Sequence, residues 1–148
     1  MTPDDPTGRM ARECVAVRAR MLARYVSGVC DAGLRGTGLR VGQVNLLAAV
    51  GHAGPLTPTA LAAALVLDKS TLSRDVAPLL AGRLLRKRPG PDARSHTLEL
   101  TAAGRRKLLA VLPAWEAAQA DLRAALGADN LPALFAAAGR LAADGPAG

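Results

Sequence analysis

The side chains best suited to chemistry in this chain are cations that gather in one short stretch. Residues 83–107 hold eight Lys and Arg against two acids, Asp92 and Glu99, which leaves a charge of +6. The whole chain of 148 residues has 19 Lys and Arg against 12 Asp and Glu, a net charge of +7, so nearly all of the excess lies in this stretch. Such a concentration is typical of sites that bind the phosphates of nucleic acid or an anionic membrane surface, although a run of charge can also be a merely solvated face.

The other reactive side chains are few and far apart. Neither His52 nor His96 has a nucleophile or a carboxylate at a spacing that would form a catalytic pair, so we expect no enzyme active site. The same scarcity predicts no metal site and no other cofactor. Cys14 and Cys30 stand 16 residues apart in one predicted helix, about 24 Å along its axis, which is too far for a disulfide.

Length and composition indicate one helical domain. Half of the residues are hydrophobic, and the chain has one Trp, one Tyr and one Phe, so alanine and leucine dominate. We therefore expect a single protomer fold over residues 1–148. No apolar run approaches the length of a membrane helix, and the first residues are too polar and acidic for a signal peptide, which predicts a cytoplasmic protein without membrane contact.

Apolar residues recur at helical spacing in most of the chain. This spacing predicts helices over residues 9–32, 41–54, 57–66, 68–83, 101–126 and 131–143, and strands over 84–88 and 95–100 with a turn at 89–92. Thr57, Asp68 and Thr101 are expected to be N-caps. Pro78 predicts a kink or an early helix end, and Pro113 predicts a bend.

The helix predicted over residues 68–83 has two contrasting faces. One is an apolar stripe made of Leu72, Val76, Leu79 and Leu80. The other carries Ser70, Thr71, Ser73, Arg74 and Ala77. A face that is small, polar and cationic suits close approach to a large partner surface.

Two short helices joined by a tight turn and followed at once by a basic hairpin have the order of a winged helix-turn-helix, with residues 57–81 as the helical pair. This order predicts a mostly α fold with a small β-hairpin wing, whose second helix enters the major groove of double-stranded DNA. The candidate DNA contacts are Ser70, Thr71, Ser73, Arg74, Arg86, Lys87, Arg88, Asp92, Arg94 and Ser95. The alternative is that the hairpin cations only make the surface soluble. The helix pair, the wing and the charge together favour the interpretation that these cations bind DNA.

Three segments carry a more specific pattern: LTPTALAAAL, LDKSTLSRDVAPLL and above all PDARSHTLELTAAG. In the last, Asp92, Arg94, Leu100, Thr101 and Gly104 form an Asp-x-Arg step followed by a strand and a Leu-Thr-x-x-Gly helix start. With them, residues 39–104 resemble the DNA-binding lobe of the MarR (multiple antibiotic resistance regulator) family.

The resemblance implies a homodimer whose terminal helices, residues 9–38 and 105–148, intertwine. It also implies two winged lobes that bind a near-palindromic DNA site with Arg94 in a minor groove. One departure is Gly82, which precedes Arg83, whereas many members have glycine immediately before the first wing strand. The local turn is therefore expected to shift by one residue.

Family members are often repressors that a small molecule releases from DNA, commonly from a crevice between the dimerisation helices and the lobe. Arg18 and Arg20 are candidate partners for an anionic effector, with plain solvent-facing arginines as the alternative. Some members sense peroxide through a cysteine in the first helix, which makes Cys14 a redox candidate. In the peroxide-sensing subgroup, the resemblance implies a sensing cysteine flanked by tyrosines. Tyr25 is the only tyrosine in this chain, so a buried, inert Cys14 is favoured.

Two further alternatives stay open. The chain could be a non-specific architectural DNA-binding protein, in which phosphate contacts alone give steep salt dependence without sequence preference. It could also be a winged helix that binds only protein.

Overall fold

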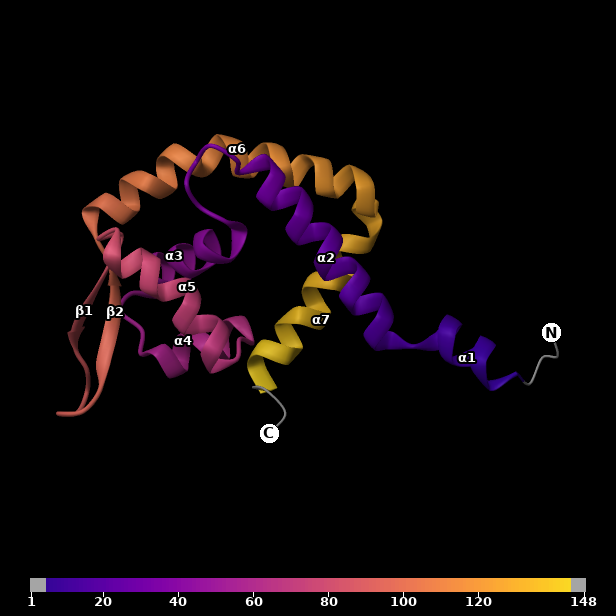
Figure 1. The fold of residues 1–148 in the computed structure, drawn as a ribbon, viewed down its shortest axis with the longest axis horizontal. Coiled ribbons are helices and arrows are strands. Elements are labelled where there is room, and N and C mark those ends of the chain that lie inside the picture. Colours follow the sequence, from indigo (N-terminus) through magenta and orange to yellow (C-terminus); the bar gives the residue numbers. More distant parts are fainter. Residues whose placement is uncertain (1–4, 145–148) are drawn as a thin grey trace.

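The structure is a computed structural model that describes residues 5–144 of the 148-residue chain. Its elements are helices α1 (Pro6–Glu13), α2 (Val15–Gly33), α3 (Val41–Ala53), α4 (Pro58–Leu65) and α5 (Lys69–Ala81), strands β1 (Leu85–Pro89) and β2 (His96–Leu100), helix α6 (Ala102–Leu126), a short 3-10 helix η1 (Ala128–Asn130) and helix α7 (Leu131–Asp144). The two strands pair as an antiparallel hairpin at one end of the molecule (Figure 1). The predicted mostly helical fold with one small hairpin is confirmed.

Helices α3, α4 and α5 pack with the hairpin into a lobe around one apolar core. Leu46, Leu47, Leu61 and Leu98 are completely buried in it. Leu98 lies in the middle of β2, and its backbone also exchanges hydrogen bonds of 2.7 and 3.1 Å with Leu56, just before α4. The core and this extra pairing therefore fix the orientation of the hairpin relative to the helices of the lobe.

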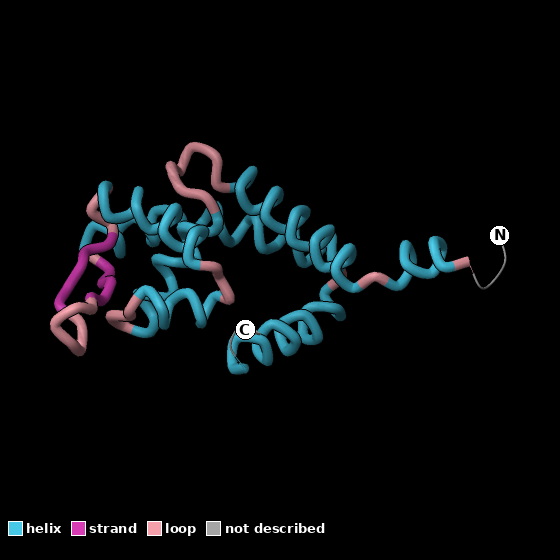
Figure 2. Tube along the Cα trace, turned by 60° about the horizontal axis from the view of Figure 1, so that its bottom comes forward, coloured by secondary structure: helices cyan, strands magenta, loops and turns pink. Residues whose placement is uncertain are grey.

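The long helices α2 and α6 pack against each other beside the lobe, α1 extends away from it, and α7 runs back from the end of α6 to contact α4 (Figures 1 and 2). A Cβ atom added at Gly33 of α2 would lie 3.0 Å from the Cβ of Ala118 in α6, so glycine is what permits this close approach. Within residues 5–144, no helix is long and apolar enough to span a membrane.

The four terminal helices leave an extensive apolar surface uncovered. Its large side chains are Met10, Val15, Val17, Met21, Leu22, Tyr25, Leu109, Leu112, Leu134, Phe135 and Leu141. So many large apolar side chains exposed on four helices suit a surface that a partner covers.

The predicted helix caps are confirmed. The side-chain oxygen of Thr57 accepts a hydrogen bond from the Ala60 N–H at 3.1 Å, and that of Asp68 accepts from the Thr71 N–H at 2.8 Å. Thr101 likewise accepts from the Gly104 N–H at 2.9 Å. Each cap satisfies one backbone N–H that the first helical turn leaves without a partner.

The prediction of one continuous helix over residues 9–32 is wrong. The chain is extended at Cys14, where φ is −68° and ψ is 110°, and this residue separates α1 from α2. The Arg18 guanidinium donates to the carbonyl oxygens of Ala11 and Arg12 at 3.4 and 3.2 Å. These bonds satisfy carbonyls that the end of α1 exposes, which a periodic apolar pattern does not reveal.

Pro78 does not end its helix early, because α5 continues to Ala81, in keeping with the helix predicted over residues 68–83. Proline removes one backbone N–H, but the last turn of α5 is held in place by Leu79, which is buried in the core. Pro113 lies inside α6, which Figure 1 shows as one curved helix.

Candidate nucleic-acid interface

Helix α5 presents the two faces that its sequence predicts. Leu72, Val76 and Leu79 are buried in the core. On the other side Ser70, Ser73 and Arg74 are exposed, and Thr71 is half-buried. Apart from the exposed cations Lys69 and Arg74, this side carries short side chains, so the helix backbone can come close to a partner.

The start of α5 is held by Asp68. Its carboxylate accepts from both the N–H and the hydroxyl of Thr71, each at 2.8 Å, and these bonds hold its pKa below the ordinary value. Arg74 in turn donates to the Thr71 hydroxyl oxygen at 3.4 Å. A short chain of polar contacts thus fixes Thr71 and orients Arg74 on the exposed face.

We define the wing as residues 85–100. The turn at its tip is organised by Asp92. Its Oδ1 atom accepts from the backbone N–H groups of Arg94 and Ser95, both at 2.9 Å. The two bonds lower the pKa of Asp92 below its ordinary value. The backbone at Arg94 is therefore fixed while its side chain stays exposed.

The strands of the wing send alternate side chains to opposite faces. In the register of the hairpin, Lys87 stands opposite the buried Leu98 and therefore shares its face. Lys87 and His96 line, together with Lys69 and Ser73 of α5, a pocket of about 360 Å³ between the wing and the helix. Cations from both elements thus meet beside the exposed face of α5.

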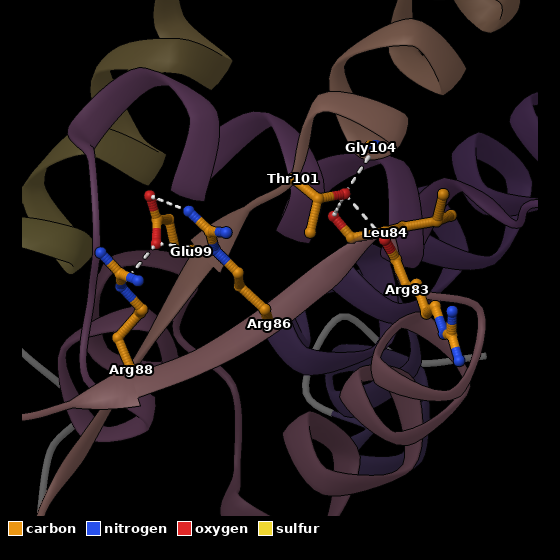
Figure 3. A network of polar contacts seen from close by, with 7 residues as sticks. All are labelled: Arg83, Leu84, Arg86, Arg88, Glu99, Thr101 and Gly104. Atoms are coloured by element: carbon orange, nitrogen blue, oxygen red, sulfur yellow. Dashed lines mark hydrogen bonds and ion pairs between the residues drawn. The ribbon is translucent and has the colours of Figure 1, made fainter.

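Arg86 and Arg88 lie on the other face of the wing, where both contact Glu99 (Figure 3). Glu99 accepts two hydrogen bonds from Arg86, at 3.0 and 3.1 Å, and lies 3.1 Å from Nε of Arg88. The sequence predicted all three strand cations as equivalent DNA contacts and did not reveal this pairing, which depends on the register of the two strands.

The base of the wing is tied to α6 through Thr101 (Figure 3). Its hydroxyl lies 2.7 Å from the carbonyl oxygen of Arg83 and 3.1 Å from that of Leu84, and it also caps Gly104. Arg83 has the left-handed φ of 57° and Gly82 has an ordinary φ of −78°. The left-handed residue of this turn is thus Arg83, one residue after Gly82.

The remaining cations of the basic stretch do not belong to the wing. Arg105 and Arg106 are exposed in the first turns of α6. The Lys107 ammonium donates to the carbonyl oxygen of Thr37, in the loop between α2 and α3. Residues 83–107 therefore contribute to more than one surface, and Lys107 joins a long helix to the segment that leads into the lobe.

The candidate effector and redox residues lie away from the wing. Arg18 caps α1, and Arg20 is exposed on α2. The prediction that Cys14 is buried is wrong: it is half-buried, because the chain breaks between α1 and α2 at this residue, where it lines an open pocket of about 860 Å³. Cys30 is buried, and burial raises the pKa of its thiol. No cluster of three or more potential metal ligands occurs within residues 5–144.

Known proteins share both the motif and the fold. The model of the MarR family matches residues 37–95. The transcriptional regulator MosR of M. tuberculosis, solved in complex with DNA, is 32% identical, with 86% of this chain and 98% of that chain covered and a TM-score of 0.71. No curated protein sequence gives a match.

Two more distant structures have the same fold. The PcaV transcriptional regulator of Streptomyces coelicolor, in complex with its natural ligand, is 24% identical over 96% of this chain and 97% of that one, with a TM-score of 0.75. A mutant of MarR from E. coli, complexed with operator DNA, is 18% identical over 90% of this chain and 96% of that one, again with a TM-score of 0.75. This chain belongs to the MarR family of transcriptional regulators, as its wing motif, the matched family model and its likeness to MosR together indicate.

Proposed function

We propose that this chain is a homodimeric regulator that binds a near-palindromic double-stranded DNA site and acts as a repressor released by a small molecule. The observation that carries the DNA-binding part is the combination of α5 and the wing tip. The exposed face of α5 is small, polar and cationic, and Asp92 fixes the backbone of the wing tip, where Arg94 is exposed. Phosphate contacts would orient the lobe, and side chains of α5 would read base edges.

The proposed contacts divide by role. Ser70, Thr71, Ser73 and Arg74 would face base edges in the major groove, because they occupy the exposed face of α5. Arg94 would enter the minor groove, where its guanidinium meets a narrow, negative environment. Lys87 and Ser95 would contact the backbone, whereas Asp92 would act by positioning the tip. Arg86 and Arg88 form ion pairs with Glu99, which limits their contact with phosphates.

A second copy of the chain is the proposed cover for the apolar surface of α1, α2, α6 and α7. Burying that surface against an identical one would produce a two-fold symmetric pair of lobes. The two copies of α5 in such a dimer would contact two half-sites related by the same two-fold axis, which is why the proposed DNA site is near-palindromic. MosR and the E. coli MarR mutant were each solved with DNA.

Replacing Arg94 by Ala is expected to weaken binding to every DNA sequence, by about 1 to 3 kcal/mol if its guanidinium makes one charge-assisted contact in the groove. Arg74→Ala should instead change the order of preference among variants of the selected site, because Arg74 lies on the face that would read bases. Fluorescence anisotropy with the tightest duplex selected from a random library, and with its point variants, measures both effects.

The matched control is Arg35→Ala, which removes one exposed cation from the α2–α3 loop and should leave the affinity nearly unchanged. Full affinity of Arg94→Ala at moderate salt would show that the wing tip does not contact DNA. If Arg74→Ala lowers the affinity for all duplexes by the same factor, α5 does not read bases.

The effector part of the proposal rests on how the lobes are joined to the long helices. The Lys107–Thr37 contact connects α6 to the segment that enters the lobe, so a ligand between these elements can change the spacing of two lobes. Arg20 is an exposed candidate partner for an anionic or aromatic ligand, whereas Arg18 would have to leave the carbonyls that it caps. PcaV was solved with its natural ligand.

A thermal-shift screen of small aromatic and anionic metabolites is expected to give at least one stabilising compound that lowers affinity for the selected duplex by about 5- to 150-fold, the usual range of allosteric coupling. Compounds that stabilise the protein but leave DNA binding unchanged would contradict release by an effector. Redox control would then be tested with Cys14→Ser, because Cys14 is the half-buried thiol.

A further inference from the structure

The wing strands carry three cations and one carboxylate. The cations Arg86, Lys87 and Arg88 are on β1, and Glu99 is on β2. Arg86 is paired with Glu99 across the hairpin, and Arg88 is two residues further along the same face. Both guanidinium groups point toward the Glu99 carboxylate in Figure 3. The register of the hairpin thus brings two of the three strand cations to one acid.

The contacts with Glu99 engage Nε and one terminal nitrogen of Arg86, and Nε of Arg88. Arg86 uses Nε and one terminal nitrogen to reach both carboxylate oxygens, at 3.0 and 3.1 Å, which is the bidentate arrangement. The Nε atom of Arg88 lies 3.1 Å from Oε2 of Glu99, the same oxygen that accepts from Nε of Arg86. A phosphate that bound these nitrogens would compete with the Glu99 carboxylate, which lowers the combined charge of the two arginines from +2 to +1.

The face on which this cluster lies is turned away from α5. Lys87 is on the opposite face, together with Leu98, and lines the pocket next to α5. When α5 is docked in a major groove, the Glu99 face therefore points away from the groove that α5 reads. A loosely docked complex with random DNA has no such constraint, because phosphate contacts hold it in many orientations.

We propose that Glu99 is a specificity-determining residue: by holding Arg86 and Arg88, it keeps two cations from the phosphates of non-operator DNA while leaving operator binding to α5, Lys87 and Arg94. The inference rests on the proposed function. Non-specific affinity is almost wholly electrostatic, so each cation withheld from phosphates lowers it. The ratio of operator to non-operator affinity rises accordingly.

The test compares the wild-type chain with Glu99→Gln, which keeps the size of the side chain and removes its charge. The probes are the tightest duplex selected from a random library and a shuffled duplex of the same length and composition, each titrated at several salt concentrations. Glu99→Gln should bind the shuffled duplex about 3- to 10-fold more tightly, with a salt slope steeper by about 1 to 2, as one or two added phosphate contacts require. Its affinity for the selected duplex should change less than about 2-fold, so that the specificity ratio falls.

Two further variants give this test its controls. Glu116→Gln makes the same substitution at an exposed site on α6, far along the chain from the wing, and should leave the specificity ratio unchanged. Arg86→Gln with Arg88→Gln should abolish the gain in non-operator affinity when combined with Glu99→Gln. This pair tests the inference independently if Glu99→Gln alone lowers the melting temperature.

Three outcomes overturn the inference. An unchanged ratio in Glu99→Gln would mean that the arginines are not withheld from random DNA. Weaker binding of both duplexes would mean that Glu99 positions the arginines for phosphate contact. A wild-type chain without preference for any selected duplex would overturn the proposed function itself, which distinguishes that failure from the first two.

Discussion

Replacing both Leu109 and Phe135 by aspartate is expected to yield a monomer that has lost most of its affinity for a two-half-site operator. The two side chains are 65% and 61% exposed, on α6 and α7, and so contribute little to the fold of a single chain. Two charges in an apolar interface would lack partners and lose their hydration. In a dimer, one bound lobe holds the second lobe close to its half-site and so raises the affinity for the whole operator. A monomer lacks this gain, and operator affinity should fall by about 100-fold or more.

Light scattering should give about twice the 15.1 kDa chain mass for the wild type and the single mass for the double variant. Val66→Asp is the matched control, because Val66 is also an exposed apolar residue but lies between α4 and α5, and it should keep the double mass. Circular dichroism should show native helicity for both variants. A wild-type mass near 15.1 kDa at micromolar concentration would contradict the proposed dimer.

The second large effect is expected on stability, from Gly104→Ala. Gly104 is buried in the first turn of α6, where an added Cβ atom would collide with the carbonyl oxygen of Leu84 and lie 2.6 Å from Cδ1 of Leu100. The backbone oxygen cannot move away without disturbing the Thr101 bonds at the base of the wing. We expect a loss of about 1 to 3 kcal/mol in the free energy of unfolding, as overpacked sites generally show.

The loss should lower the melting temperature by about 3 to 10 °C, measured by calorimetry at a fixed protein concentration. Gly139→Ala is the matched control, because a Cβ atom at this position in α7 would meet nothing within 4 Å. Since alanine is a better helix former than glycine, that variant should be neutral or slightly more stable. Equal melting temperatures for the two variants would show that α6 can move away from the wing at little cost.

Features that depend on neighbours a few residues away could be predicted from the sequence. Thr57, Asp68 and Thr101 cap helices because each side chain reaches an N–H three residues later, whatever the rest of the chain does. Likewise, the apolar stripe of α5 could face only a core, which left its polar face outside. The Asp92 turn that presents Arg94 is equally local.

Contacts between residues far apart in the chain depend on the tertiary structure. Glu99 meets Arg86 and Arg88 only because of the hairpin register, and Lys107 meets Thr37 only because α6 passes the α2–α3 loop. These pairings divide a basic stretch that looks uniform in the sequence into cations that are paired, cations that join elements and cations left exposed on the wing. Composition counts charges, but the packing of the chain decides which partner each charge has and so which ones DNA can use.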